Sequence, residues 1–175
     1  VRVLHFVTGG FSGGATQVAI QLVNAAREGD AVESLLVLRR KPRTPPERIA
    51  ELARAGVPLR MVPGWSHLAS VIALVRICRE FRPDVLVAHG FSEHLWGRYA
   101  GVLAKVPHLV HVEHNTRERY TAWRLAQARW LAKRTDRIVG CSGGGRRVLL
   151  EMGMPAARTI AIPKGLRLEP LPRLL

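Results

Sequence analysis

The sequence contains few acidic residues for its length. Its 175 residues include 13 Asp and Glu against 27 Lys and Arg, which gives a net charge of +14. A protein with this net positive charge attracts anions. The charge therefore implies an anionic partner, such as nucleic acid, a membrane surface or a phosphorylated substrate. Charge alone does not choose among these partners.

Cysteines and long hydrophobic runs are also scarce. Cys78 and Cys141 are far apart and follow no metal-binding or redox spacing, so we expect reduced thiols that pack as small apolar groups, as in the cytoplasm. The longest apolar stretch, residues 68–78, is interrupted by Arg76 and is too short to cross a bilayer. The N-terminus has no signal-peptide pattern. We therefore expect a cytoplasmic protein whose only membrane contact would be peripheral, on the inner face.

The composition is otherwise that of a folded domain. Hydrophobic residues make up 47% of the chain, and no low-complexity tract is present. The length fits one domain with its own core. Because the sequence starts at Val1 without Met and residues 169–175 are proline-punctuated, we expect a piece of a longer protein.

Short apolar runs typical of strands alternate with helical patterns along the chain. The predicted strands are residues 1–8, 34–38, 58–62, 84–88, 108–112, 136–140 and 159–162. The first predicted helix carries an apolar stripe of Val18, Leu22, Ala25 and Ala26, and a later one carries Val71, Leu74, Val75 and Cys78. Pro83 should end that later helix. The pattern predicts an α/β fold: a Rossmann-like, doubly wound parallel sheet of about six or seven strands, with helices on both faces and ligands at the carboxyl ends of the strands.

The stretch TGGFSGGATQ, residues 8–17, joins the first strand to the first helix. Its glycines do not fit the G-x-G-x-x-G spacing of dinucleotide sites, and Arg39 and Arg40 replace the acidic residue that would hold a ribose. It matches a phosphate-binding P-loop except that Ala15 stands where the lysine belongs, which disfavours a nucleotide triphosphatase. Two readings remain: a loop that admits an anion or sugar at a helix N-terminus, or a tight turn that needs positive φ.

Two other patterns stand out. The basic segment 39–43, followed by Pro45 and Pro46, is typical of a solvated connector. Further along, helical spacing places two tryptophans and two arginines on one stripe: Arg119, Trp123, Trp130 and Arg134. A different face of that helix carries Leu125, Ala128 and Ala132. We expect the alanine-rich face to pack on the sheet and the tryptophans to be tucked under loops; exposed tryptophans would instead indicate a membrane or partner surface and a lipid-linked acceptor.

Four segments in order, each at a predicted strand end, resemble the N-terminal, acceptor-side domain of GT-B glycosyltransferases of family 4. They are FVTGGFSGGAT (6–16), RPDVLVAHG (82–90), VEHN (112–115), and RIVGCS (137–142) followed by GMP (153–155) and IAIPKG (160–165). The resemblance implies a retaining hexosyltransferase of two domains. Residues 1–165 would form the first domain and residues 166–175 the start of a linker or tail. The donor-binding domain with its paired glutamates would lie outside this chain, which alone should be inactive.

The resemblance also implies a set of site residues. His114 would be the catalytic group near the reacting sugar, since an imidazole donates or accepts protons near neutral pH. Glycine-loop residues would lie against donor phosphate or acceptor, and polar strand-end residues would bind hydroxyls. These substrate-binding residues are Gly13, Gly14, Thr16, His89, Glu93, Asn115, Thr116 and Ser142. For His114 and His89 the alternative is a strand-end histidine that only satisfies backbone groups.

The implied ligands are a nucleotide-sugar donor, UDP- or GDP-linked, and a saccharide or lipid-linked acceptor in cell-envelope polysaccharide synthesis. No tightly bound cofactor is expected. No metal is expected either, because His108, His111, Glu113 and His114 do not follow a metal-site spacing and alternate strand residues point to opposite faces. Two alternatives stay open: a GT-B-fold nucleotide-sugar epimerase, and a basic nucleic-acid-binding domain.

Overall fold

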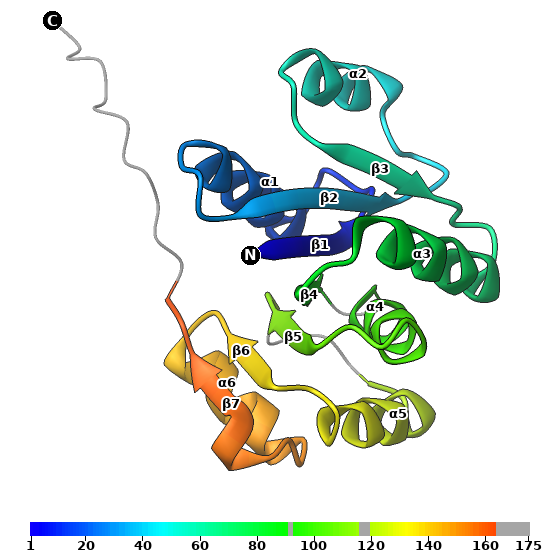
Figure 1. The fold of residues 1–175 in the computed structure, drawn as a ribbon. Helices are drawn as coiled ribbons and strands as arrows, with labels where there is room; N and C mark the ends of the chain where they lie inside the picture. The colour runs from blue at the N-terminus through cyan, green and yellow to red at the C-terminus, as the bar shows by residue number, and fades with distance from the viewer. Residues whose placement is uncertain (91–92, 116–119, 164–175) are drawn as a thin grey trace, which may run out of the picture.

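The computed structural model describes residues 1–90, 93–115 and 120–163. These residues form one seven-stranded parallel sheet in the order β3-β2-β1-β4-β5-β6-β7, with helices on both faces (Figure 1). The doubly wound α/β fold predicted from the sequence is confirmed.

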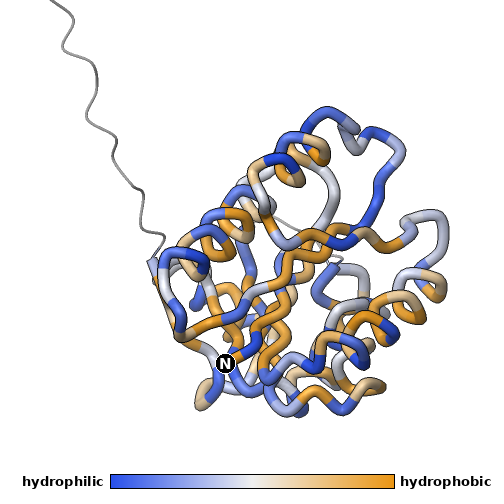
Figure 2. The backbone as a smooth tube through the Cα atoms, turned by 45° about the horizontal axis from the view of Figure 1, so that its top comes forward, coloured by the Kyte–Doolittle hydropathy of each residue, from blue (hydrophilic) through white to orange (hydrophobic). Residues whose placement is uncertain are grey.

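Each predicted strand is present, and each of its ends falls within one residue of the prediction. The strands are β1 (Arg2–Thr8), β2 (Glu33–Arg39), β3 (Leu59–Val62), β4 (Val85–His89), β5 (His108–Glu113), β6 (Arg137–Gly140) and β7 (Thr159–Ala161). Runs such as VLVAH and RVLHFVT are apolar on both faces, as central strands of a parallel sheet require. Figure 2 shows this as hydrophobic colour through the middle of the molecule.

The helices are α1 (Gly14–Arg27), α2 (Pro46–Arg54), α3 (His67–Phe81), α4 (Glu93–Leu103), α5 (Ala122–Ala132) and α6 (Gly143–Glu151), followed by a 3₁₀ turn at Ala156–Arg158. The sheet grows in one direction from β1 to β3 and in the other from β4 to β7. Right-handed crossovers therefore place α1 and α2 on one face and α3 to α6 on the other. The change of direction, between β1 and β4, is a topological switch point where open sheets of this kind bind ligands.

The two predicted helix stripes had different outcomes. All four residues of the stripe on α3 are buried, and α3 ends at Phe81, where Arg82 adopts a left-handed conformation before Pro83. The stripe predicted for α1 was wrong. That helix buries Thr16, Ala19, Ile20 and Val23 instead, whereas Leu22 is 45% exposed. Leu22 and Ala25 line a groove of about 660 Å³ between α1 and the apolar side chains of β5 and β6, so helical periodicity found the right helix but not the side that meets the sheet.

The predicted domain covers all seven strands, the last of which ends at Ala161. The linker or tail expected at residues 166–175 lies outside the described residues. Within the described ranges, no helix combines the length and the apolar character needed to cross a membrane.

Candidate functional site

The carboxyl ends of β1, β4, β5 and β6 lie side by side along one edge of the sheet. His5 is in register with Val87, His89 with Val112, and Glu113 with Gly140. The glycine loop after β1 and His114 after β5 therefore share this carboxyl edge, with the end of β4 between them. Both features therefore lie at the carboxyl ends of the strands, where the sequence pattern predicts ligands.

The glycine loop approaches the end of β2 closely. The Gly9 amide donates to the carbonyl oxygen of Arg39 at 2.7 Å, and a Cβ atom at Gly9 would lie 2.5 Å from that oxygen. Gly13 caps α1 with φ of −109°, without a side-chain cap. The loop glycines do not have positive φ, since the glycines with positive φ in the described residues are Gly56, Gly90 and Gly153. The interpretation as a turn that needs positive φ is therefore wrong. Close approach requires glycine at Gly9, whereas a Cβ atom at Gly13 would meet no atom within 4 Å, and the N-terminus of α1 is left exposed.

Thr16 is part of the support of the loop. It is fully buried, and its hydroxyl lies within hydrogen-bonding distance of two backbone carbonyl oxygens, Gly10 at 2.7 Å and Thr8 at 3.1 Å. Because no surface of Thr16 is accessible, we correct its assignment from ligand contact to positioning of the loop. Gly13 and Gly14, by contrast, are exposed.

Three histidines and a cysteine form a hydrogen-bonded row across the face of the sheet that α1 covers. His5 Nδ1 lies 3.1 Å from His89 Nε2, and His89 Nδ1 lies 3.0 Å from His114 Nε2. His114 Nδ1 lies 3.6 Å from Cys141 Sγ. We call these four residues the imidazole row. Sequence reasoning selected His89 and His114 but missed His5, which stands inside an apolar strand pattern and looks like a core position.

Burial keeps the inner part of the imidazole row neutral. It lowers the pKa of His5 to about 4 and lowers the pKa of His89 well below 6.5, with further lowering from His5 and His114. A neutral imidazole carries one N–H, so the hydrogen bonds along the row must all point in the same direction. The tautomer of His114 is therefore tied to that of His89, and through it to that of His5. His114 itself is only half-buried, and the thiol opposite its Nδ1 is a weak partner that a ligand hydroxyl can replace.

The two cysteines differ in environment. Cys78 is buried in the core, where burial raises the pKa of its thiol to about 12. It fits the prediction of a reduced, apolar-packed thiol. Cys141 is partly exposed and contacts His114, so it belongs to the candidate site.

A second polar network lies on the other face of the sheet, under α4. Arg98 donates from Nη2 to His94 Nδ1 at 2.7 Å, which leaves the imidazole proton on Nε2. His94 Nε2 then donates to the Tyr120 hydroxyl at 2.6 Å, and that hydroxyl donates to Glu113 Oε2 at 3.0 Å. Arg98 and His94 are fully buried. Sequence reasoning missed this network because its members come from a helix, a strand and a loop with no common spacing.

Glu113 therefore does not face the same crevice as His114. It is 7% exposed and points to the face under α4, because successive strand residues alternate. Burial raises the pKa of Glu113, but the neighbouring His111, followed by hydrogen bonds from Tyr120 and the Asn115 amide, outweighs burial and lowers this pKa below its ordinary value. Glu113 and His114 are adjacent in the VEHN segment but belong to networks on opposite faces of the sheet.

His94, His111 and Glu113 present ligand atoms within 4.8 Å of one another, the one group of metal-ligating residues found in the described ranges. His111 is buried with both ring nitrogens without a hydrogen-bond partner, and its Nε2 atom lies 3.6 Å from Glu113 Oε2. Both nitrogens of His94 are engaged, however, and Arg98 adds a buried positive charge beside it. The donor set thus fits a hydrogen-bonded network better than a cation site.

Glu93 begins α4 and binds the basic segment after β2. Its Oε1 atom lies 2.7 Å from Lys41 Nζ and 3.4 Å from Arg39 Nη1. Arg39 is 4% exposed and also contacts Ser70 Oγ and the Gly64 carbonyl oxygen. The expectation of a solvated connector was wrong for Arg39, and Glu93 is an internal ion-pair partner at the edge of the site.

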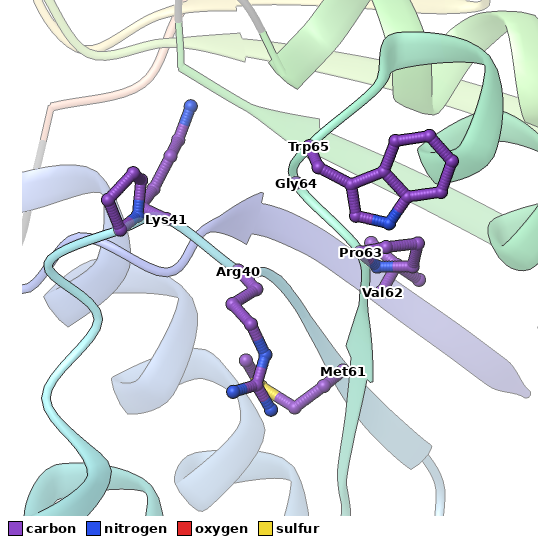
Figure 3. A pocket seen from close by; sticks show the side chains of 8 residues that line it. Arg40, Lys41, Met61, Val62, Pro63, Gly64 and Trp65 are labelled. Atoms are coloured by element: carbon purple, nitrogen blue, oxygen red, sulfur yellow. The ribbon is translucent and has the colours of Figure 1, made fainter.

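A cavity of about 540 Å³ opens between the segment that follows β2 and the end of β3 with the turn after it. Figure 3 shows Arg40 and Lys41 on one side and Met61 to Trp65 on the other. The lining combines two cations with an indole that is 84% exposed. Such a surface can hold an anionic or sugar group by charge and by stacking.

The remaining predicted site residues are placed as follows. Asn115 is exposed beside His114, and Ser142 is exposed at the start of α6, where its hydroxyl accepts a hydrogen bond from the Gly145 amide at 2.9 Å. Thr116 lies outside the described residues, as does Arg119. At the carboxyl edge the structure thus brings together His114, Asn115, Gly13 and Gly14, with His89 fully buried behind them.

The sequence matches the family model described as Glycosyltransferase Family 4 over residues 12–170. None of the curated proteins matches the sequence. Among solved structures, HepE from Anabaena in complex with UDP-glucose has a TM-score of 0.75 and 20% identity over 94% of this chain and 44% of that chain. A glycosyltransferase from Rickettsia africae has a TM-score of 0.77 and 13% identity over 94% of this chain and 43% of that chain.

An epimerase also shares the fold. UDP-GlcNAc 2-epimerase from Neisseria meningitidis, bound to UDP-GlcNAc, has a TM-score of 0.66 and 15% identity over 92% of this chain and 45% of that chain. At these identities the likeness establishes the fold alone. The chain spans less than half the length of each of these three proteins.

Proposed function

The chain belongs to glycosyltransferase family 4, and we propose that it is the acceptor-side domain of an enzyme that transfers a sugar, with retention, from a nucleotide-sugar to a saccharide or lipid-linked acceptor. One observation carries the proposal: the exposed N-terminus of α1 and His114 stand at the same carboxyl edge of the sheet. Because residues of a second domain would complete the site, the chain alone should not turn over substrate.

The exposed amides of Gly13 and Gly14 are suited to the negative charge that develops on the leaving diphosphate. His114 is suited to contact the sugar or the acceptor hydroxyl through Nδ1, and the imidazole row holds its other nitrogen. His89 acts through His114 as a positioning residue. We favour UDP over GDP as the nucleotide of the donor, since HepE was crystallised with UDP-glucose.

The acceptor would enter beside the cavity of Arg40, Lys41 and Trp65, which opens at the same edge as the glycine loop. Arg40 and the exposed indole of Trp65, beside a Lys41 already paired with Glu93, favour an acceptor that carries a phosphate or carboxylate next to a sugar. An acceptor of this kind is consistent with synthesis of envelope polysaccharide in the cytoplasm.

The test is a radiolabelled transfer assay on the full-length protein with UDP- and GDP-sugars. His114→Ala should lower kcat by about 10²–10⁴-fold. Gly14→Val should weaken donor binding, because a branched side chain would cover the helix amides. His108→Ala is the matched control: this exposed histidine lies at the opposite end of β5. Unchanged turnover in His114→Ala would remove His114 from the site.

The second candidate is a nucleotide-sugar epimerase, favoured by the fold shared with the Neisseria enzyme. The products separate the two: an epimerised nucleotide-sugar with no acceptor present would support the epimerase, and an acceptor glycoside with retained anomeric configuration would support the transferase. The family assignment gives no support to the nucleic-acid-binding alternative.

A further inference from the structure

Most of the exposed large hydrophobic side chains lie on one layer of helices, α3 to α5, where Leu103 at the end of α4 is 60% exposed. Ten such side chains are exposed in the described residues, and five belong to α3, to the turn before it and to α5. These five are Trp65 (84% exposed), Leu68 (69%), Ile72 (46%), Trp123 (74%) and Trp130 (44%). The expectation that Trp123 and Trp130 are tucked under loops was therefore wrong. The predicted packing face of α5 was right, since Ala128 and Ala132 are buried.

Contacts across α4 join the two exposed groups. The His67 ring at the start of α3 stacks on Trp96 of α4 with ring centroids 4.1 Å apart, and Tyr99 of α4 lies 6.0 Å from Trp130. Arg124 of α5 is close enough to His67 to lower its pKa, after burial and Arg39. Figure 1 shows α3, α4 and α5 as neighbours on one face of the sheet. These ring contacts link the three helices, and the five exposed side chains lie on this layer; we call the five together the α3–α5 surface.

The cations of this layer are arranged around its apolar side chains. On α3, Leu68, Ile72, Arg76 and Arg79 recur at helical spacing and are exposed, and Trp65 lies in the turn before the helix. Glu80, the exposed acidic residue of this helix, lies 3.7 Å from Arg60 Nη1. The sequence of α5 has no acidic residue. The Arg134 guanidinium lies 3.8 Å from the centre of the Trp130 ring, with its positive charge next to the exposed indole.

We propose that the α3–α5 surface docks the protein on a bilayer that contains anionic lipids. Exposed indoles are suited to the headgroup level of a membrane, and flanking arginines extend to lipid phosphates while their stems cover apolar surface. The charge of the chain, +14, is complementary to an anionic leaflet. A dry protein–protein contact would have to leave these charges unpaired or find an equally acidic partner.

Docking would also fix the orientation of the candidate site relative to the membrane. Trp65 borders both the α3–α5 surface and the cavity of Arg40 and Lys41. The bound orientation therefore places the opening of that cavity beside the lipid headgroups. This inference goes beyond the proposed function, because a surface can dock whether or not the site transfers a sugar.

The experiment is sedimentation of this chain, and of the full-length protein, with vesicles of phosphatidylcholine mixed with phosphatidylglycerol. Pure phosphatidylcholine vesicles should bind much less. Trp123→Ala with Trp130→Ala should lower partitioning at least about tenfold. Ile72→Ala should weaken binding while Leu22→Ala should not: the two side chains are 46% and 45% exposed but lie on opposite faces of the sheet.

A charge reversal gives a second matched pair. Arg79 and Arg54 are both exposed and both lie in the last turn of a helix, but Arg54 is on α2, across the sheet. Arg79→Glu should reduce binding to the anionic vesicles at least about fivefold, and Arg54→Glu should reduce it much less.

Three results would overturn the proposal. In the first, the α3–α5 variants bind vesicles as tightly as the wild-type protein, or the control variants lose as much binding as the α3–α5 variants do. Another is a dimer in ultracentrifugation that Trp123→Ala abolishes, without vesicle binding. In the third, this chain binds vesicles but the full-length protein does not, because another part of the full-length protein would then cover the α3–α5 surface. Transfer to a soluble acceptor in the full-length protein should survive Trp123→Ala, so failure of docking and failure of the proposed function remain distinguishable.

Discussion

As the pH falls, this domain should lose stability before the pH reaches the range in which its carboxylates take up protons. Burial lowers the pKa of His5 to about 4 and also lowers the pKa values of His89, His94 and His111. The unfolded chain takes up these protons near pH 6.5, whereas the folded chain does not, so the free energy of unfolding falls as the pH drops below that value. For His5 alone, a change from about pH 7.5 to about pH 5 costs about 2 kcal/mol. The other three histidines act in the same direction.

The assay is urea unfolding of the chain, followed by circular dichroism at both pH values. His5→Asn keeps a polar atom near the position of Nδ1 but removes the titration, so the difference in unfolding free energy between the two pH values should shrink by about 2 kcal/mol. The lowered pKa of Glu113 contributes little in this window, because stabilisation from a depressed carboxyl pKa is lost only below its unfolded value of 4.5. His108→Asn controls for loss of an exposed imidazole. If the pH dependence of His5→Asn matched the wild type, His5 would not be neutral in the folded state and the directional order of the imidazole row would fail.

Three substitutions test the packing around the site, each measured as the change in unfolding free energy. Gly97→Ala should cost about 1–3 kcal/mol, since the new Cβ would lie 2.8 Å from Phe6 Cδ1 in the core; a neutral effect would show that the core yields there. Thr16→Val should cost about 1–3 kcal/mol, because it removes the hydroxyl that the glycine-loop carbonyls contact, and a loss below that range would contradict the supporting role. Glu93→Gln should cost about 3 kcal/mol by leaving the charge of Arg39 buried without its carboxylate, and equal stability would mean that the contacts of Arg39 with Ser70 and Gly64 are sufficient to hold its charge.

The sequence was sufficient for the fold because its signals are local. Apolar strands and the turns that bound them repeat seven times, and parallel pairing then brings their carboxyl ends to one edge. His89 and His114 could be selected from the sequence because each stands at the end of such a strand. The same local reasoning failed for α1, where two apolar stripes compete and only the position of the sheet decides which one is buried.

Contacts between elements that are distant in the sequence could not be predicted from it. His94 and Arg98 are four residues apart on α4, but no spacing relates them to Tyr120 and Glu113, and the network exists because α4 packs over the end of β5. Arg39 ends a strand and reads as the start of a basic loop, yet Glu93 from a distant helix meets it inside the fold. Exposure of Trp123 and Trp130 likewise depends on what covers α5, which helical periodicity does not specify.

The tip of β5 joins the two polar networks. Glu113 turns to the face under α4, where the hydroxyl of Tyr120 donates to it, and the next residue, His114, turns to the opposite face and joins the imidazole row. Alternation along a strand makes this arrangement unavoidable, since two consecutive side chains cannot share a face. Any displacement of the β5 tip therefore moves both networks together. The neutral imidazoles of His5 and His89 position the His114 side chain from one face of the sheet. On the other face, the Glu113 carboxylate beside Arg98 holds the backbone that carries His114. The orientation of His114 at the carboxyl edge therefore depends on packing on both faces of the sheet.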